Sequence, residues 1–72
     1  MGFFAKSHKE LARKNPSGYL QRKYEHSERQ LKYYASIGDK KKLKQIMKEH
    51  AKWEYAMLYQ QTPEYRRFKR WK

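Results

Sequence analysis

Apolar and aromatic residues recur along most of the chain at intervals of three and four residues, the spacing that gathers side chains on one face of an α-helix. No segment shows the sustained alternation of a half-buried β-strand. Clusters of turn-forming residues interrupt the pattern at intervals. The sequence therefore predicts a single small all-α domain. Its centre is an antiparallel hairpin of helices at about 16–37 and 40–61, flanked by shorter helices at about 3–14 and 63–72.

The interruptions carry helix start and stop signals. Asn15 is positioned to cap the helix that follows it, with Pro16 at the first helical position, where a missing N–H has no cost. Gly38 suits the left-handed residue that ends a helix, and Asp39 suits the N-cap of the next one. The Thr-Pro-Glu at 62–64 predicts the capped start of the last helix.

Apolar stripes on the helices identify the predicted core. The stripe of the first long helix consists of Leu20, Tyr24, Ser27, Leu31, Tyr34 and Ala35. The stripe of the second consists of Leu43, Ile46, Met47, Trp53, Met57 and Leu58. The short first helix has an apolar side of Phe3, Phe4, Leu11 and Ala12. A helix this short is ordered only when it docks, so residues 1–14 are a candidate for a loosely ordered segment.

The size and composition set limits on stability and location. A chain of 72 residues buries about 60% of the surface that it exposes when unfolded, so a homodimer or a bound partner would add stability. The aromatic fraction of 17% argues for a folded core rather than disorder. The absence of cysteine removes disulfides and favours a reducing, cytoplasmic location. No segment approaches the roughly 20 apolar residues of a membrane span.

The strongest compositional signal is positive charge. The chain has 19 Lys and Arg against 7 Asp and Glu, a formal net charge of +12. Solubility requires a net charge of only about 2–8 in a small domain, and the excess repels itself. We therefore expect a polyanionic partner, with nucleic acid favoured over an acidic protein surface or an anionic membrane.

The cations are arranged in stripes. In the second long helix four lysines spaced 3, 4 and 4 lie opposite the apolar stripe, and two tyrosines continue their line. Cations displace counterions from phosphates, and exposed rings stack on unpaired bases. In the first long helix Glu25 and Glu28 are each placed to pair with a cation four residues on. The predicted nucleic-acid contacts are Lys41, Lys44, Lys48, Lys52, Tyr55, Tyr59, Arg22, Arg29, Tyr33, Arg66, Arg67 and Arg70.

Three alternatives remain open. The hairpin has the outline of a helix-turn-helix, but the lysines at 40–42 follow the turn where an apolar anchor is usual, so we expect phosphate contacts rather than base reading. The chain could instead be a protein–protein module, such as an inhibitor, adaptor or assembly factor, that docks on an acidic protein surface. Its last helix, in which Tyr65, Phe68 and Trp71 oppose the arginines, could also lie on a membrane surface.

No catalytic, metal or cofactor site is predicted. The histidines, at 8, 26 and 50, are scattered, and no glycine-rich phosphate loop or nucleophile motif is present. His50 and Glu54 form an i, i+4 pair within the apolar arc. We interpret this pair as structural, hydrogen-bonded to a tyrosine of the first long helix or placed at a dimer interface, rather than catalytic. We expect a protein that is not an enzyme.

Overall fold

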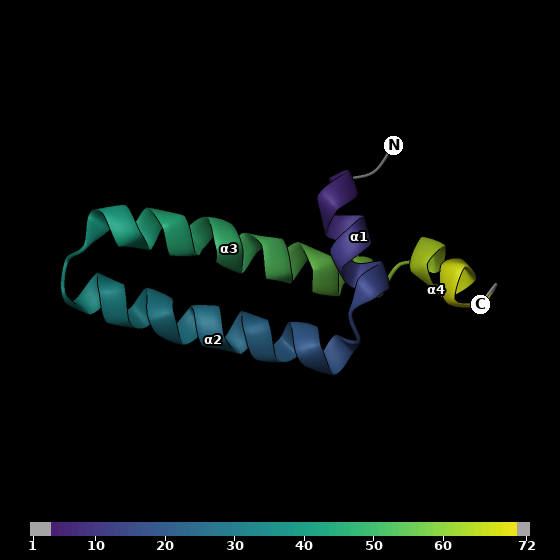
Figure 1. The fold of residues 1–72 in the computed structure, drawn as a ribbon, viewed down its shortest axis with the longest axis horizontal. Helices are drawn as coiled ribbons and strands as arrows, with labels where there is room; N and C mark the ends of the chain where they lie inside the picture. The colour runs from purple at the N-terminus through teal and green to yellow at the C-terminus, as the bar shows by residue number, and fades with distance from the viewer. Residues whose placement is uncertain (1–3, 71–72) are drawn as a thin grey trace.

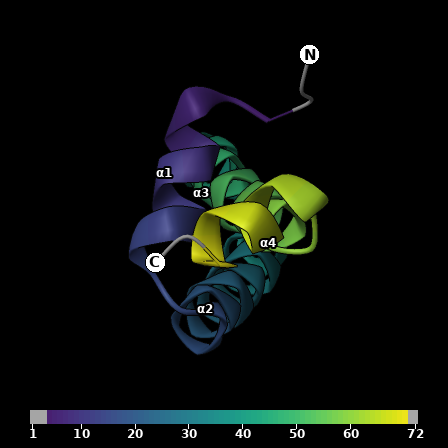
Figure 2. The ribbon, with the colours of Figure 1, turned by 90° about the vertical axis from the view of Figure 1, so that its right-hand side faces the viewer.

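The computed structural model describes residues 4–70, and these form four α-helices and no β-strand (Figure 1). Helices α2 and α3 lie antiparallel along the long axis, while α1 and α4 gather at the end away from their turn (Figure 1). In the end-on view α1 lies beside α3 and α4 crosses the end of the hairpin (Figure 2). The predicted all-α hairpin with two flanking helices is confirmed. The helices are α1 Lys6–Lys14, α2 Ser17–Ser36, α3 Lys40–Tyr59 and α4 Pro63–Arg70.

The turn between α2 and α3 follows directly from its sequence. Gly38 has a φ of +74°, the left-handed conformation in which an L side chain is strained. The N–H of Gly38 donates to the carbonyl of Ala35 at 3.2 Å, and that of Asp39 donates to Tyr34 at 3.1 Å. These two bonds make a Schellman motif. The Asp39 carboxylate then accepts the N–H of Lys42 at 3.1 Å, which confirms the predicted cap of α3.

The start of α2 differs from the prediction. Pro16 rather than Asn15 is its N-cap, and no side chain caps the helix. Pro16 has an extended backbone (ψ 160°) and is therefore not the first helical residue, so Asn15 lies one residue too early to cap α2 and instead ends α1. Its side-chain amide accordingly donates backwards, to the carbonyl of Leu11 at 2.9 Å.

Helix α3 is the centre of the fold because it packs against α2 on one side and α1 on another. The buried core cluster takes residues from all three helices: Ala12, Leu20, Trp53, Ala56 and Tyr59. Phe4 and Leu11 pack against this cluster, so α1 docks on the core. The prediction for Phe3 lies outside the described residues.

The docking of α1 also changes which residues of α3 are buried. Ala56 and Tyr59, which lie outside the predicted stripe, are fully buried. Met47 and Leu58, which lie within it, are 55% and 43% exposed. The prediction assumed that α3 packs against one helix only. A second helix, α1, covers a different part of the circumference of α3, and one edge of the predicted apolar stripe stays in solvent.

A buried polar contact joins the middle of the hairpin. Ser27, which is 2% exposed, has its Oγ 2.8 Å from His50 Nδ1, and the His50 ring stacks on Tyr24 at 4.4 Å. The single hydroxyl proton is donated to the Tyr24 carbonyl at 2.8 Å, so the serine oxygen accepts from the imidazole. The tyrosine therefore stacks instead of accepting a hydrogen bond from the histidine. Glu54 is exposed and takes no part.

No helix in the described range is long and apolar enough to cross a membrane. The described fold is an elongated arrangement whose Cα atoms extend over 46 × 25 × 14 Å. Along most of its length it is two helices thick, because α1 and α4 cover only one end (Figure 1).

The turn gives a first testable prediction. Gly38→Ala introduces a Cβ that meets no atom within 4 Å, so its cost arises from the left-handed backbone alone. We expect a loss of ~1 kcal/mol, seen as a melting midpoint about 4–8 °C lower by circular dichroism.

Gly18→Ala is the matched control. Its added Cβ also meets nothing within 4 Å, but Gly18 has a helical backbone. This substitution is expected to stabilise the protein by about 0.4–1 kcal/mol. Equal destabilisation by both changes would contradict the assignment of the turn.

Candidate nucleic-acid interface

Three lysines form an exposed face on the N-terminal half of α3. Lys41, Lys44 and Lys48 are all exposed, and they lie on the side of α3 away from α2. Lys44 and Lys48 are each two residues from the buried Ile46, which places them about 200° around the helix from it. None of the three is in an ion pair with any described residue. We call this set the lysine face.

The predicted continuation of this face is covered by α1. Tyr59 is only 1% exposed, so the expectation that its ring is free to stack on a base is wrong. Tyr55 is 40% exposed, with His8 stacked on it at 5.2 Å. The Lys52 ammonium lies 4.7 Å from the centroid of the Trp53 ring, and the residue is half-buried. The two tyrosines of the predicted stripe therefore contact α1, while Lys52 lies against a ring of α3 itself.

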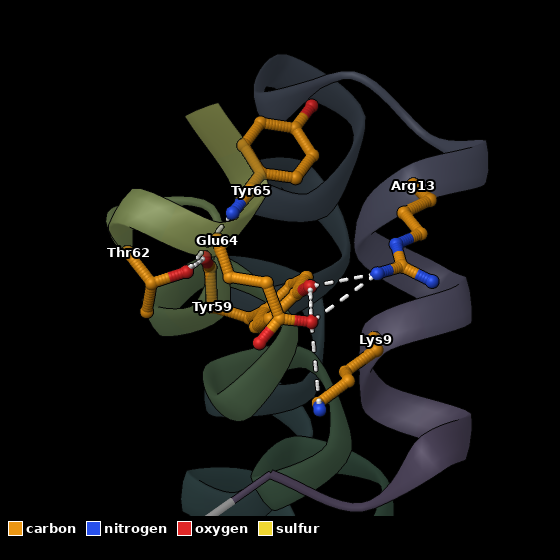
Figure 3. Close-up of polar contacts among 6 residues, drawn as sticks. All are labelled: Lys9, Arg13, Tyr59, Thr62, Glu64 and Tyr65. Atoms are coloured by element: carbon orange, nitrogen blue, oxygen red, sulfur yellow. Dashed lines mark hydrogen bonds and ion pairs between the residues drawn. The ribbon is translucent and has the colours of Figure 1, made fainter. Parts of the chain in front are cut away.

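Tyr59 is held in a polar cluster that joins α1, α3 and α4 (Figure 3). Its hydroxyl donates to the Glu64 carboxylate at 2.6 Å and accepts from Arg13 at 3.1 Å. Arg13 also contacts Glu64 at 3.3 Å, and Lys9 Nζ lies 3.5 Å from the same oxygen (Figure 3). We call Lys9, Arg13, Tyr59 and Glu64 the Glu64 cluster. Two cations of α1 thus share a single carboxylate, which offsets only one of their two charges.

The position of Glu64 is fixed by the start of α4. The Thr62 hydroxyl accepts the N–H of Tyr65 at 3.3 Å, which confirms the predicted cap (Figure 3).

The neighbouring Gln60 joins α3 to the end of α1. Its side chain donates to the carbonyls of Ala12 and Asn15, both at 2.9 Å. These last bonds satisfy the end of α1. No local pattern signals them, because Gln60 is more than 40 residues from the carbonyls that it reaches.

The Glu64 cluster changes the ionisation of both of its acids. Burial raises the pKa of the Tyr59 hydroxyl, and the hydrogen bond to Glu64 raises it further, since both disfavour the phenolate. The hydrogen bond from Tyr59 is the main cause that lowers the pKa of Glu64, against a smaller opposing effect of desolvation. The cations of Lys9 and Arg13 also lower it.

The arginines of α4 form a second basic surface. Arg66, Arg67 and Arg70 are exposed, while Tyr65 and Phe68 are half-buried on the other side of the helix. The predicted separation of arginines from aromatic residues is confirmed for these two rings. Trp71 lies outside the described residues.

The third basic surface lies on the outside of α2. Arg22, Arg29 and Tyr33 are exposed there, with Tyr33 at 58%. The pairs expected for Glu25 and Glu28 are not among the ion pairs of the described residues, and Glu25 instead accepts from Gln21 at 2.9 Å. We call Arg22, Arg29 and Tyr33 the arginine face.

Two further residues extend the arginine face. Tyr19 and Lys23 line a shallow depression together with Arg22, Arg29, His26 and one acidic residue, Glu25. The Lys23 ammonium lies 5.5 Å from the centroid of the Tyr19 ring. Neither residue was among the predicted contacts. Their positions, three and four residues from members of the same face, were the available signal.

The twelve predicted contact residues are therefore not brought together into one surface. Among the described residues no three His, Asp or Glu side chains lie close enough to hold a metal ion. No protein-family model, curated protein or solved structure matches this chain. The arrangement of charge and exposed rings is what bears on function.

The Glu64 cluster predicts an acid-dependent stability. Because the pKa of Glu64 is lowered in the folded protein, its contribution is present above the ordinary pKa of glutamate and is lost as the pH falls through the lowered value. Glu64→Gln should lower the urea midpoint at pH 7, and its difference from wild type should shrink towards pH 3. Tyr59 has the opposite pH dependence. Its contribution to stability is lost as the pH rises through its raised pKa.

Two variants make this test specific. Tyr59→Phe removes the donor that mainly lowers the pKa of Glu64, and at pH 7 it is expected to cost about 1–2 kcal/mol. Glu10→Gln removes an exposed carboxylate outside the cluster and should leave the urea midpoint nearly unchanged at pH 7. A Glu64→Gln difference that stays constant from pH 7 to pH 3 would contradict the role given to the cluster.

Proposed function

We propose that this protein is a non-enzymatic nucleic-acid-binding protein that contacts mainly the phosphate backbone. The observation that carries the proposal is the lysine face: Lys41, Lys44 and Lys48 are exposed together and unpaired on one side of a rigid helix. Like charges at these spacings destabilise a helix, and a polyanion would offset that cost.

The dimensions of the lysine face suit a phosphate backbone. From Lys41 to Lys48 the helix rises about 10 Å. Over that length B-DNA presents about six phosphate charges, since it carries one charge per ~1.7 Å. Lysine ammonium groups on flexible stems act as point charges that accept many geometries. Such contacts position a nucleic acid without reading its bases.

Tyr33 adds the remaining candidate for base stacking. It is the most exposed tyrosine of the described residues, and it lies four residues from Arg29 on the same helix face. An exposed ring beside a cation is suited to unpaired bases, where stacking contributes about 1–3 kcal/mol per base. Tyr55 contributes less, because His8 and Phe4 lie against its ring.

A protein partner with an acidic surface is the second candidate. The exposed side chains of Met47 and Leu58 favour a protein partner, since a phosphate backbone offers no apolar surface for them to contact. The two functions differ in salt dependence. Binding to a protein partner through such side chains persists at high salt, whereas phosphate contacts weaken steeply.

The test is the salt dependence of binding. Fluorescence anisotropy with labelled duplex DNA, single-stranded DNA and RNA, between 50 and 200 mM salt, gives log K against log salt. Replacing Lys41, Lys44 and Lys48 together by Gln should reduce the slope by about 0.9 for each phosphate that the variant no longer neutralises, and by about 2–3 in total.

Lys6→Gln, Lys14→Gln and Lys32→Gln together make the matched control. These cations are exposed but lie outside the predicted contacts, and the charge removed is the same. The control is expected to keep most of the wild-type slope. An equal loss of slope in both triple variants would show that only total charge matters. Absence of binding near 150 mM salt would reject the proposal.

A further inference from the structure

The lysine face and the arginine face point in opposite directions. Four cations of these faces each lie two residues along the chain from a buried residue. Arg22 is two residues from buried Leu20, Arg29 is two from buried Ser27, and Lys44 and Lys48 are each two from buried Ile46. Two residues correspond to about 200° around a helix. Since the buried residues face the partner helix, both sets of cations face away from it.

The thickness of the hairpin separates these faces. Packed helices lie about 8–10 Å apart, and a helix with side chains is about 10–12 Å across. The two outer faces are therefore about 20 Å apart. A duplex that lies on one face would have to bend around a radius of about 10 Å to reach the other, whereas its persistence length is about 500 Å. One duplex cannot use both faces.

Both faces are nevertheless equipped to bind phosphates. None of their cations is in an ion pair with a described residue, unlike Lys9 and Arg13 of the Glu64 cluster. The arginine face adds guanidinium groups, each of which can donate two parallel hydrogen bonds to one phosphate group. At about 20 Å two bound duplexes would also be more than two Debye lengths apart at 0.15 M salt, so their mutual repulsion is largely screened.

We propose that one molecule bridges two duplex segments, holding one on the lysine face and the other on the arginine face. The bridging rests on the proposed function and extends it from binding to cross-linking. It assigns a role to the arginine face, which a single straight duplex on the lysine face leaves unused.

The test measures binding and bridging separately. Anisotropy of one labelled duplex reports binding. Energy transfer between a donor-labelled and an acceptor-labelled duplex of about 20 base pairs reports bridging. Wild-type protein should produce energy transfer at a low ratio of protein to duplex. The transfer should fall again in excess protein, when each duplex is saturated by separate molecules.

Variants of each face decide between a bridging monomer and other arrangements. The triple variant of the lysine face and the double variant Arg22→Gln, Arg29→Gln should each bind one duplex with a smaller salt slope. Each should lose energy transfer down to the level of the duplex mixture alone. Lys6→Gln with Lys14→Gln is the matched control for the double variant and should retain it. Circular dichroism confirms that each variant is folded.

Three results would overturn the bridging. Wild-type binding without energy transfer at any ratio would reject it and leave the proposed function standing. Transfer that persists in both single-face variants would also reject it, because dimers could then bridge through two copies of the same face. Absence of binding in the anisotropy measurement would reject the proposed function itself.

Discussion

The tertiary structure depends on the burial of Tyr59 between α1, α3 and α4. Helices of nine and eight residues, such as α1 and α4, are not stable alone and must dock to form. Tyr59 supplies the common contact: its ring meets Phe4 at 5.4 Å and Tyr65 at 6.0 Å, and its hydroxyl joins the Glu64 cluster. With few fully buried side chains in the described core, this junction closes one end of a hairpin that would otherwise be only two helices thick.

The junction also decides where the charge is displayed. Because α1 docks over the C-terminal half of α3 (Figure 1), the lysine face is limited to the N-terminal half. A two-helix layer has an outer face on each side, and in this chain both are basic. Placing cations on opposite faces reduces their mutual repulsion, which a single surface of the same charge would concentrate.

Local signals made part of this structure predictable. The turn at Gly38 and Asp39, the cap at Thr62 and the two long helices depend on residues within one or two turns, and all were confirmed. Asn15 was the local exception, because Pro16 is itself extended and helix α2 starts one residue later than expected. Which face each exposed cation occupies also followed from helical spacing, since that requires only the identity of the buried stripe.

Contacts between distant segments were not predictable in the same way. Helical spacing places Tyr59 on the surface, because its position aligns with the lysines of α3 and nothing within α3 indicates that α1 covers it. Hydrophobic periodicity specifies a helix with one buried side, so a helix with two neighbours at different angles is described incompletely by one stripe.

The distinction between internally paired and free cations follows from these contacts. A net charge of +12 alone does not separate the cations that stabilise the fold from those available to a partner. The geometry does, because Lys9 and Arg13 are committed to Glu64, while the lysine and arginine faces have no acidic partner among the described residues. A ligand that binds only the folded chain stabilises it by mass action. Under the proposed function, the repulsion among these cations would weaken the isolated fold, and a bound polyanion would offset it.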